Sequence, residues 1–163
     1  MNIQSKTEDE ALLVASISLG EAAFGIDAQR VQEVTKVGDL TRVHRAPAHV
    51  VGIRNLRGRI VTVLDLRIRL ELGSVEPGPE SRILIVEGPG EPIGLLVDRV
   101  ADMISVNRAD IRPAPPNVHG VQSRNLQGVC RGGGRLVALL DLVTVLQTET
   151  EAGPAAVREN LPA

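Results

Sequence analysis

Two stretches of this chain are copies of one another. Residues 50–70, VVGIRNLRGRIVTVLDLRIRL, align without a gap with residues 126–146, LQGVCRGGGRLVALLDLVTVL, at a constant offset of 76 positions. Eight of the 21 aligned positions are identical: Gly52/Gly128, Gly58/Gly134, Arg59/Arg135, Val61/Val137, Leu64/Leu140, Asp65/Asp141, Leu66/Leu142 and Leu70/Leu146. Most of the other positions exchange one aliphatic residue for another. A self-match of this kind indicates an internal duplication.

The segments that precede the two copies also align. Phe24-Gly25 matches Ile93-Gly94, and Arg30-Val31 matches Arg99-Val100, at an offset of 69 positions. The 163 residues therefore divide into two related halves, each of about 65 residues, and a unit of that size buries only about 60% of its unfolded surface. We expect the two halves to pack against each other and to unfold cooperatively.

Short alternating runs predict strands. Ala15, Ile17 and Leu19 alternate with Ser16 and Ser18, which is the pattern of a half-buried strand. Comparable runs predict strands at 11–19, 22–26, 34–37, 53–57, 59–64, 83–86, 92–97 and 102–106. Glycines predict the turns of two hairpins, at Gly58 and at Gly132-Gly133-Gly134, because glycine accepts the positive φ of a tight turn.

Aspartates precede several short helical segments. We expect Asp65 to cap a helix at 66–72 that Gly73 closes, and Asp141 to cap a helix at 142–147, since a carboxylate can accept the free N–H groups of a first turn. Asp27 and Asp98 are expected to cap single helical turns, and Pro47 to start a short helix or turn ending near Gly52.

Five short strands in each half favour a closed barrel over an open sheet. The predicted fold is mainly β: two SH3-like five-stranded β-barrels related by a pseudo-two-fold axis, with short helical segments. We expect a flexible tail at 1–10, a single domain at 11–146 with barrels at about 11–73 and 82–146, and a disordered tail at 147–163. The pattern leaves open whether strands are exchanged between the barrels.

Composition argues against several functions. The net charge is −2 with mixed signs, and Phe24 is the only aromatic residue, so the basic stripe and stacking platforms of a nucleic-acid binder are missing from the sequence. The apolar runs are too short to span a membrane and the first residues lack a signal pattern. We therefore expect a cytoplasmic protein with no direct membrane insertion. Cys130 is the single cysteine and is read as a strand residue.

Two groups of side chains are candidates for a catalytic or metal-binding site. Asp65 and Asp141 occupy equivalent places in the two halves, and paired carboxylates can perform acid hydrolysis. Capping is the stronger reading, because both residues stand directly before an apolar helical run. His44, His49 and His119 lack metal-ligand spacing, so no metal and no cofactor is expected.

Specific strings resemble one family. Gly25-Ile26-Asp27, Val31-Gln32-Glu33-Val34, Asn55-Leu56-Arg57-Gly58, Val63-Leu64-Asp65-Leu66-Arg67 and Ile111-Arg112-Pro113-Ala114-Pro115 occur in this order. Together they resemble the CheW-like family of bacterial chemotaxis coupling proteins, over nearly all of residues 12–146. Thr62 departs from the family, which usually carries proline there. The resemblance implies two SH3-like barrels, in agreement with the prediction from the repeat.

The resemblance also implies a function. Proteins of this family are non-enzymatic adaptors that couple chemoreceptor signalling tips to the regulatory domain of the histidine kinase CheA, in arrays at the membrane. It implies receptor-binding residues at Val31, Glu33, Gly52, Arg57 and Met103, with Glu33 and Arg57 forming an ion pair.

For the kinase, the same resemblance implies binding at Leu40, Thr41 and Arg42, where the match is weaker. The protein is expected to be a monomer in isolation. An adaptor of a related pilus or gliding-motility pathway is the alternative.

Overall fold

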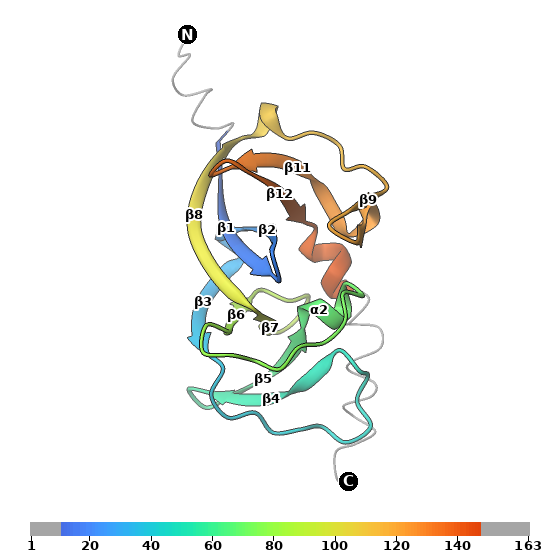
Figure 1. Ribbon diagram of the computed structural model, residues 1–163. Helices are drawn as coiled ribbons and strands as arrows, with labels where there is room; N and C mark the ends of the chain where they lie inside the picture. Colours follow the sequence, from blue (N-terminus) through green and yellow to red (C-terminus); the bar gives the residue numbers. More distant parts are fainter. Residues whose placement is uncertain (1–10, 148–163) are drawn as a thin grey trace.

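Two five-stranded sheets organise the part of the chain that the structure, a computed structural model, describes, which is residues 11–147 (Figure 1). The upper sheet in Figure 1 has the order β11-β12-β2-β1-β8, and the lower sheet has the order β3-β6-β7-β5-β4. The upper strands are β1 (Ala11–Leu19), β2 (Ala22–Asp27), β8 (Arg99–Asn107), β11 (Leu126–Gly132) and β12 (Arg135–Leu140). The lower strands are β3 (Val31–Lys36), β4 (Val50–Leu56), β5 (Arg59–Asp65), β6 (Arg82–Val86) and β7 (Ile93–Val97).

The two halves exchange their first hairpins. Strands β1 and β2 belong to the first half but pair in the upper sheet with strands of the second half, and β6 and β7 do the reverse. The strand exchange that the sequence left open is therefore present, and boundaries at 11–73 and 82–146 do not separate the two barrels. The reason is that β12 pairs in parallel with β2, and β5 in parallel with β7, and parallel neighbours require a crossover connection.

The exchange is symmetric down to the register. Ala138 pairs with Phe24 in the upper sheet, and the equivalent Thr62 pairs with Ile93 in the lower sheet. A register shift interrupts β11 between Leu126 and Gly128, and an equivalent one interrupts β4 between Val50 and Gly52. The duplicated sequence has thus produced the pseudo-two-fold arrangement predicted from the repeat.

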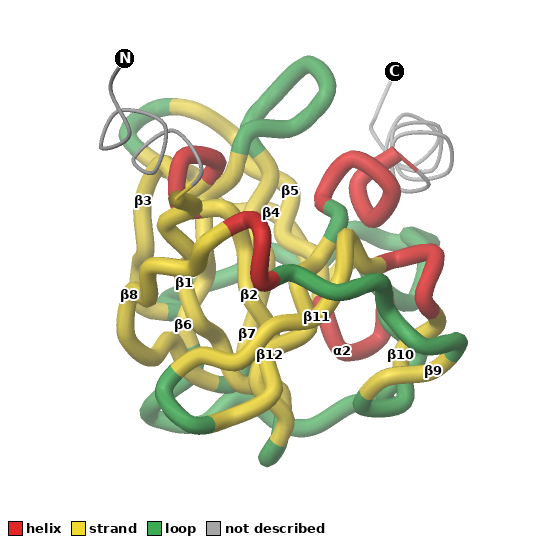
Figure 2. The backbone as a smooth tube through the Cα atoms, turned by 90° about the horizontal axis from the view of Figure 1, so that it is seen from above, coloured by secondary structure: helices red, strands yellow, loops and turns green. Residues whose placement is uncertain are grey.

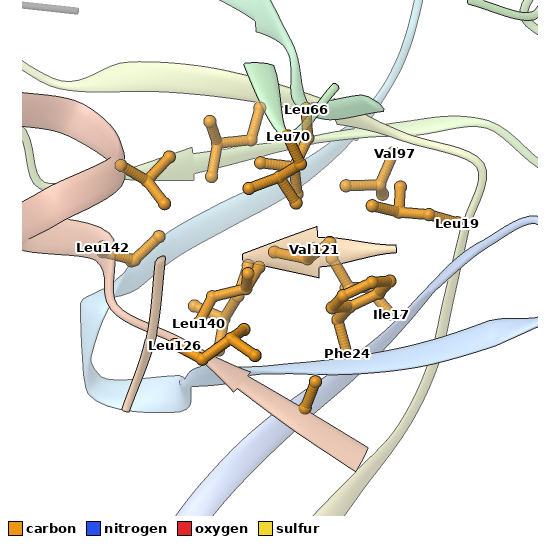
Figure 3. Packing of buried hydrophobic residues seen from close by; sticks show 14 of the residues in the cluster. Ile17, Leu19, Phe24, Leu66, Leu70, Val97, Val121, Leu126, Leu140 and Leu142 are labelled. Carbon is orange, nitrogen blue, oxygen red and sulfur yellow. The ribbon is translucent and has the colours of Figure 1, made fainter. Parts of the chain in front are cut away.

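The buried apolar residues form three clusters, one of which joins the two sheets. One fills the upper barrel, including Val14, Cys130 and Leu139, and another fills the lower barrel, including Val63 and Ile83. The largest lies between the two sheets and draws on both (Figure 3). Its fully buried members include Ile17, Phe24, Ile26, Leu64, Leu66, Leu84, Leu95 and Val145. Because the cluster belongs to neither half alone, the halves share one core.

The connecting segments are short helices and loops. They comprise η1 (Ala28–Arg30), α2 (Leu66–Arg69), η2 (Arg108–Asp110), the pair β9 (Asn117–Val118) and β10 (Val121–Gln122), η3 (Ser123–Asn125) and a helix at 142–147. Figure 2 shows loops and helical turns gathered beside the strands of the two sheets. The expectations for residues 1–10 and for most of the tail at 147–163 lie outside the described residues, and Gln147 is helical.

Two local expectations need correction. The helix at 66–72 ends at Arg69, because Glu71 adopts a left-handed φ of 62° that stops it before Gly73. Asp98 starts no helical turn, since β8 begins at the next residue. Its carboxylate binds the backbone N–H of Gly20 and the guanidinium of Arg67 instead. The expectation at Pro47 is confirmed, since Pro47 begins a turn, one of the two forms expected there.

The equivalent glycines Gly25 and Gly94 have no space for a side chain. A Cβ at Gly25 would lie 2.5 Å from Val14 Cγ1 and 2.8 Å from Leu139 Cδ2. A Cβ at Gly94 would lie 2.8 Å from Ile83 Cγ2. Each glycine therefore lets the exchanged hairpin pack directly on the interior of its adopted barrel.

We predict that Gly25→Ala lowers the free energy of unfolding by about 1–3 kcal/mol, because the added methyl overpacks the barrel interior. Urea denaturation followed by circular dichroism measures it. Gly90→Ala is the control, since nothing lies within 4 Å of a Cβ at Gly90. Equal stabilities of the two variants would contradict this account of the exchanged hairpin.

Candidate functional site

The turn between β4 and β5 holds an arginine in an unusual conformation. Leu56 pairs with Arg59, so Arg57 and Gly58 form a two-residue turn, with φ values of 55° and 86°. The N–H of Gly58 donates to Asn55 Oδ1 at 2.9 Å. The equivalent turn of the upper barrel consists of two glycines with φ values of 59° and 78°. Positive φ at both positions defines a type I′ turn, which favours glycine or asparagine.

The Arg57 side chain reaches Glu33 on β3. Arg57 Nη2 lies 2.9 Å from Glu33 Oε2, with the side chains 76% and 26% exposed. The expected ion pair is therefore present in the structure. An exposed pair contributes about 0–1 kcal/mol, whereas a left-handed non-glycine residue costs roughly 1–2 kcal/mol. The pair does not offset the conformational cost of placing arginine in the turn.

The other residues expected in the receptor site lie in three different settings. Val31 is the first residue of β3, and its half-buried side chain packs against the largest apolar cluster, which lies between the two sheets. Gly52 is buried, and a Cβ there would lie 2.5 Å from Thr41 O. Met103 lies on β8 of the upper sheet and is 57% exposed. Figures 1 and 2 both draw β3 and β8, the edge strands of the two sheets, on the same side of the molecule.

Two exposed apolar residues on or beside β3 and β8 were not predicted from the sequence as site residues. Val34 is 45% exposed on β3, and Leu13 is 50% exposed on β1. Ala15 pairs with Met103 and Leu13 pairs with Ser105, so Leu13 and Met103 are diagonal neighbours on one sheet face. The alternation of β1 could have identified Leu13, since it falls on the face opposite Val14.

The loop expected to bind the kinase is anchored to the lower barrel. Leu40 packs half-buried against the lower-barrel cluster. Thr41 exchanges two backbone hydrogen bonds with Ile53, of 2.9 and 2.7 Å. The side chains of Thr41 and Arg42 are exposed. Leu40 therefore fixes the loop, and Thr41 and Arg42 are the members available to a partner.

The two equivalent aspartates each cap their own helix. Asp65 Oδ1 accepts hydrogen bonds from the N–H groups of Arg67, at 2.9 Å, and Ile68, at 3.3 Å. Asp141 Oδ1 accepts from the N–H of Thr144 at 3.2 Å. Burial raises the pKa of Asp65, and these two backbone hydrogen bonds oppose the shift. Both carboxylates are occupied as caps, which removes the support for acid hydrolysis by this pair.

A part-buried ion pair ties α2 to the exchanged hairpin. Arg67 Nη2 donates to Asp98 Oδ2 at 2.6 Å, and the Gly20 N–H donates to the same oxygen at 2.6 Å. The hydrogen bond from Arg67, together with that from Gly20, holds the pKa of Asp98 below its ordinary value. The same pairing raises the pKa of Arg67. The pair therefore joins three segments that are distant in the sequence.

A polar pocket of about 340 Å³ adjoins this ion pair and is lined by Ser18, Gly20, Glu21, Glu80, Asp98, Arg99 and Arg135. Within residues 11–147, no three His, Cys, Asp or Glu side chains are grouped so that they could hold a metal ion. The helices of the same residues are all too short or too polar to cross a membrane.

Comparison with known proteins places these features in context. The family model described as the CheW-like domain matches residues 14–150. The chemotaxis protein CheW of Treponema pallidum is 33% identical over 138 residues, covering 82% of this chain and 81% of that protein. Protein FrzA of Myxococcus xanthus is 30% identical over 139 residues, covering 84% and 86%. The crystal structure of the scaffolding protein TtCheW from Thermoanaerobacter tengcongensis superposes with a TM-score of 0.76 at 32% identity, covering 82% and 86%.

We predict that Asp98→Asn lowers the free energy of unfolding by about 1–2 kcal/mol at pH 7, because a charge-assisted hydrogen bond is lost. Since the pKa of Asp98 is lower in the folded protein, its stabilisation is complete above the unfolded pKa of about 3.9 and is lost as pH falls through the folded pKa.

Denaturation curves between pH 7 and pH 2 measure the difference. The variant should lose less stability than the wild type over the acid range. Asp65, whose raised pKa acts with the opposite sign, is common to both proteins. Parallel pH profiles would contradict the role given to Asp98.

Proposed function

This chain belongs to the CheW-like domain family, and from that premise we propose that it is a chemotaxis adaptor without enzymatic activity. It binds the signalling tips of chemoreceptors and the regulatory domain of a CheA-type histidine kinase, and so couples one to the other. The match over most of the chain, together with the likeness to a scaffolding protein, is the observation that carries the proposal. The capping roles of Asp65 and Asp141 agree with it.

The receptor surface in this proposal comprises Val31, Glu33, Arg57 and Met103. Gly52, which the resemblance also implies, is buried under the backbone of Thr41 and would act on that surface only indirectly. The strongest support for the surface is Arg57, which occupies a left-handed position where the other half has glycine. Left-handed non-glycine residues cluster at functional sites, although Arg45, Glu71 and His119 share this conformation here. Receptor tips are helical, and a helix presents apolar residues at regular spacing to a partner. The exposed side chain of Met103 offers such residues an apolar contact.

The kinase surface in this proposal is the loop of Leu40, Thr41 and Arg42. Arg42 is exposed beyond the point where Thr41 pairs with Ile53, and exposed arginine is enriched among residues that dominate binding energy. The adaptor is proposed to be a cytoplasmic monomer that reaches membrane arrays through its receptor contacts.

A related pathway is the second candidate. Protein FrzA, which carries a different name, is as similar to this chain as several chemotaxis proteins CheW are. The second candidate function is therefore that of an adaptor in a pilus or gliding-motility pathway. Deletion of the gene separates the two, because a chemotaxis adaptor changes swimming responses and a surface-motility adaptor changes spreading on a solid surface.

We predict that Arg57→Gly leaves the free energy of unfolding unchanged or raises it by up to about 1 kcal/mol, because glycine relieves the left-handed position. The same variant should bind a receptor signalling tip about tenfold more weakly, since a central arginine contact is lost. Calorimetric titration and urea denaturation measure the two effects.

Arg57→Ala should show the same loss of binding without the gain in stability. Arg131→Ala removes an exposed arginine from β11 of the other barrel and serves as the control. Wild-type affinity of Arg57→Gly for the receptor tip would overturn the receptor surface, and failure of the wild type to bind either partner would overturn the adaptor function.

We predict that Arg42→Glu weakens binding of the kinase regulatory domain about tenfold and changes receptor-tip affinity less than twofold, because reversing an interfacial charge disrupts electrostatic complementarity. Titration of each partner separately measures this. Arg131→Glu is the matched charge reversal and should leave both affinities unchanged. Equal affinities of Arg42→Glu and wild type for the kinase domain would exclude the loop from that interface.

A further inference from the structure

The lower barrel is closed by side chains at its seam. Its sheet begins with β3 and ends with β4, and no ladder joins these two edge strands. The Glu33–Arg57 pair bridges them at one point. A second bridge comes from Arg54 of β4, which neither the repeat nor the family resemblance identified as functional.

Arg54 binds the place where β3 ends and the kinase-facing loop begins. Nη1 of its half-buried guanidinium lies 3.0 Å from Thr35 Oγ1 and 3.0 Å from Val37 O and also contacts Lys36 O, so its two hydrogens are shared among three acceptors. A Cβ at Gly38 would lie 3.2 Å from Arg54 Nη2, and Gly38 has a φ of 59°. The chain therefore turns tightly around the guanidinium as it leaves the sheet.

The far end of the same loop returns to the residue beside Arg54. Thr41 forms its two backbone hydrogen bonds with Ile53, and Gly52 provides the space for this close approach. Val37 and Leu40 pack against the lower-barrel cluster. Residues 37–41 are thus fixed at both ends to one short stretch of β4, with Arg42 exposed just beyond.

The upper barrel shows that the guanidinium is not required by the fold. The residue equivalent to Arg54 is Cys130, which is buried in the upper-barrel cluster against which Ile104 and Ile111 pack. One seam is therefore apolar, and at the other Nη1 of an arginine lies within hydrogen-bond distance of three oxygen atoms. The arginine occurs in the half that carries the proposed kinase loop.

We propose that Arg54 is a positioning residue, which presents Thr41 and Arg42 in the conformation that the kinase regulatory domain binds. The inference rests on the proposed function and adds a division of labour to it. Arg57 serves the receptor, whereas Arg54 serves the kinase by holding the loop. A leucine at this position would fill the space but would remove the donor from Val37 O, while Thr35 Oγ1 would still donate to Lys36 O.

The test compares Arg54→Leu with wild type in two measurements. Titration with the kinase regulatory domain should show binding weakened about tenfold, with receptor-tip affinity changed less than twofold. Amide hydrogen exchange of the free protein should show the N–H groups of Thr41 and Ile53 exchanging at least tenfold faster. Arg54→Lys should be intermediate, since an ammonium lacks the planar fork of donors, and Arg131→Leu should match wild type.

Each possible result of this comparison either supports or overturns the positioning role of Arg54. Wild-type kinase affinity of Arg54→Leu overturns the proposal, as does an equal loss of affinity for both partners, which would indicate a merely structural role. If Arg54→Leu does not fold, Arg54→Lys carries the same comparison. If the wild type binds neither partner, the proposed function fails. In that case, unchanged amide hydrogen exchange at Thr41 and Ile53 in Arg54→Leu also overturns the positioning role.

Discussion

Each sheet is complete only because β12 pairs in parallel with β2, and β5 pairs in parallel with β7. Each barrel is completed by a hairpin from the other half, so neither half contains a full set of strands. Gly25 and Gly94 make this possible, because neither carries a side chain that would clash with the barrel interior. The exchange also creates the largest apolar cluster, between the sheets. The shared core then makes cooperative unfolding the natural outcome.

On this symmetric framework the two seams have diverged. The lower seam carries Arg54, Arg57 and Glu33, while the equivalent region of the upper barrel carries Cys130 and a pair of glycines. Symmetry supplies the fold, and the departures from symmetry supply two distinguishable surfaces. An adaptor that binds two different partners requires such a difference.

The sequence predicts those parts of the structure that depend on neighbouring residues. Alternation located β1, and the glycines at 58 and 134 located the hairpins, because strands and tight turns are set locally. The capping of α2 by Asp65 followed for the same reason. The boundaries at 11–73 and 82–146 do not separate the barrels, because β2 pairs with β12, far along the chain. The role of Asp98 was predicted wrongly and that of Arg54 was not predicted, because the partners of both side chains are set by tertiary structure.

We propose that one copy of this protein holds a receptor tip and a kinase regulatory domain at the same time, on separate surfaces. Sedimentation of the three purified components, alone, in pairs and together, tests it most directly. The account predicts a ternary species that is heavier than either binary complex and contains one adaptor. Displacement of one partner by the other, with binary complexes only, would contradict it.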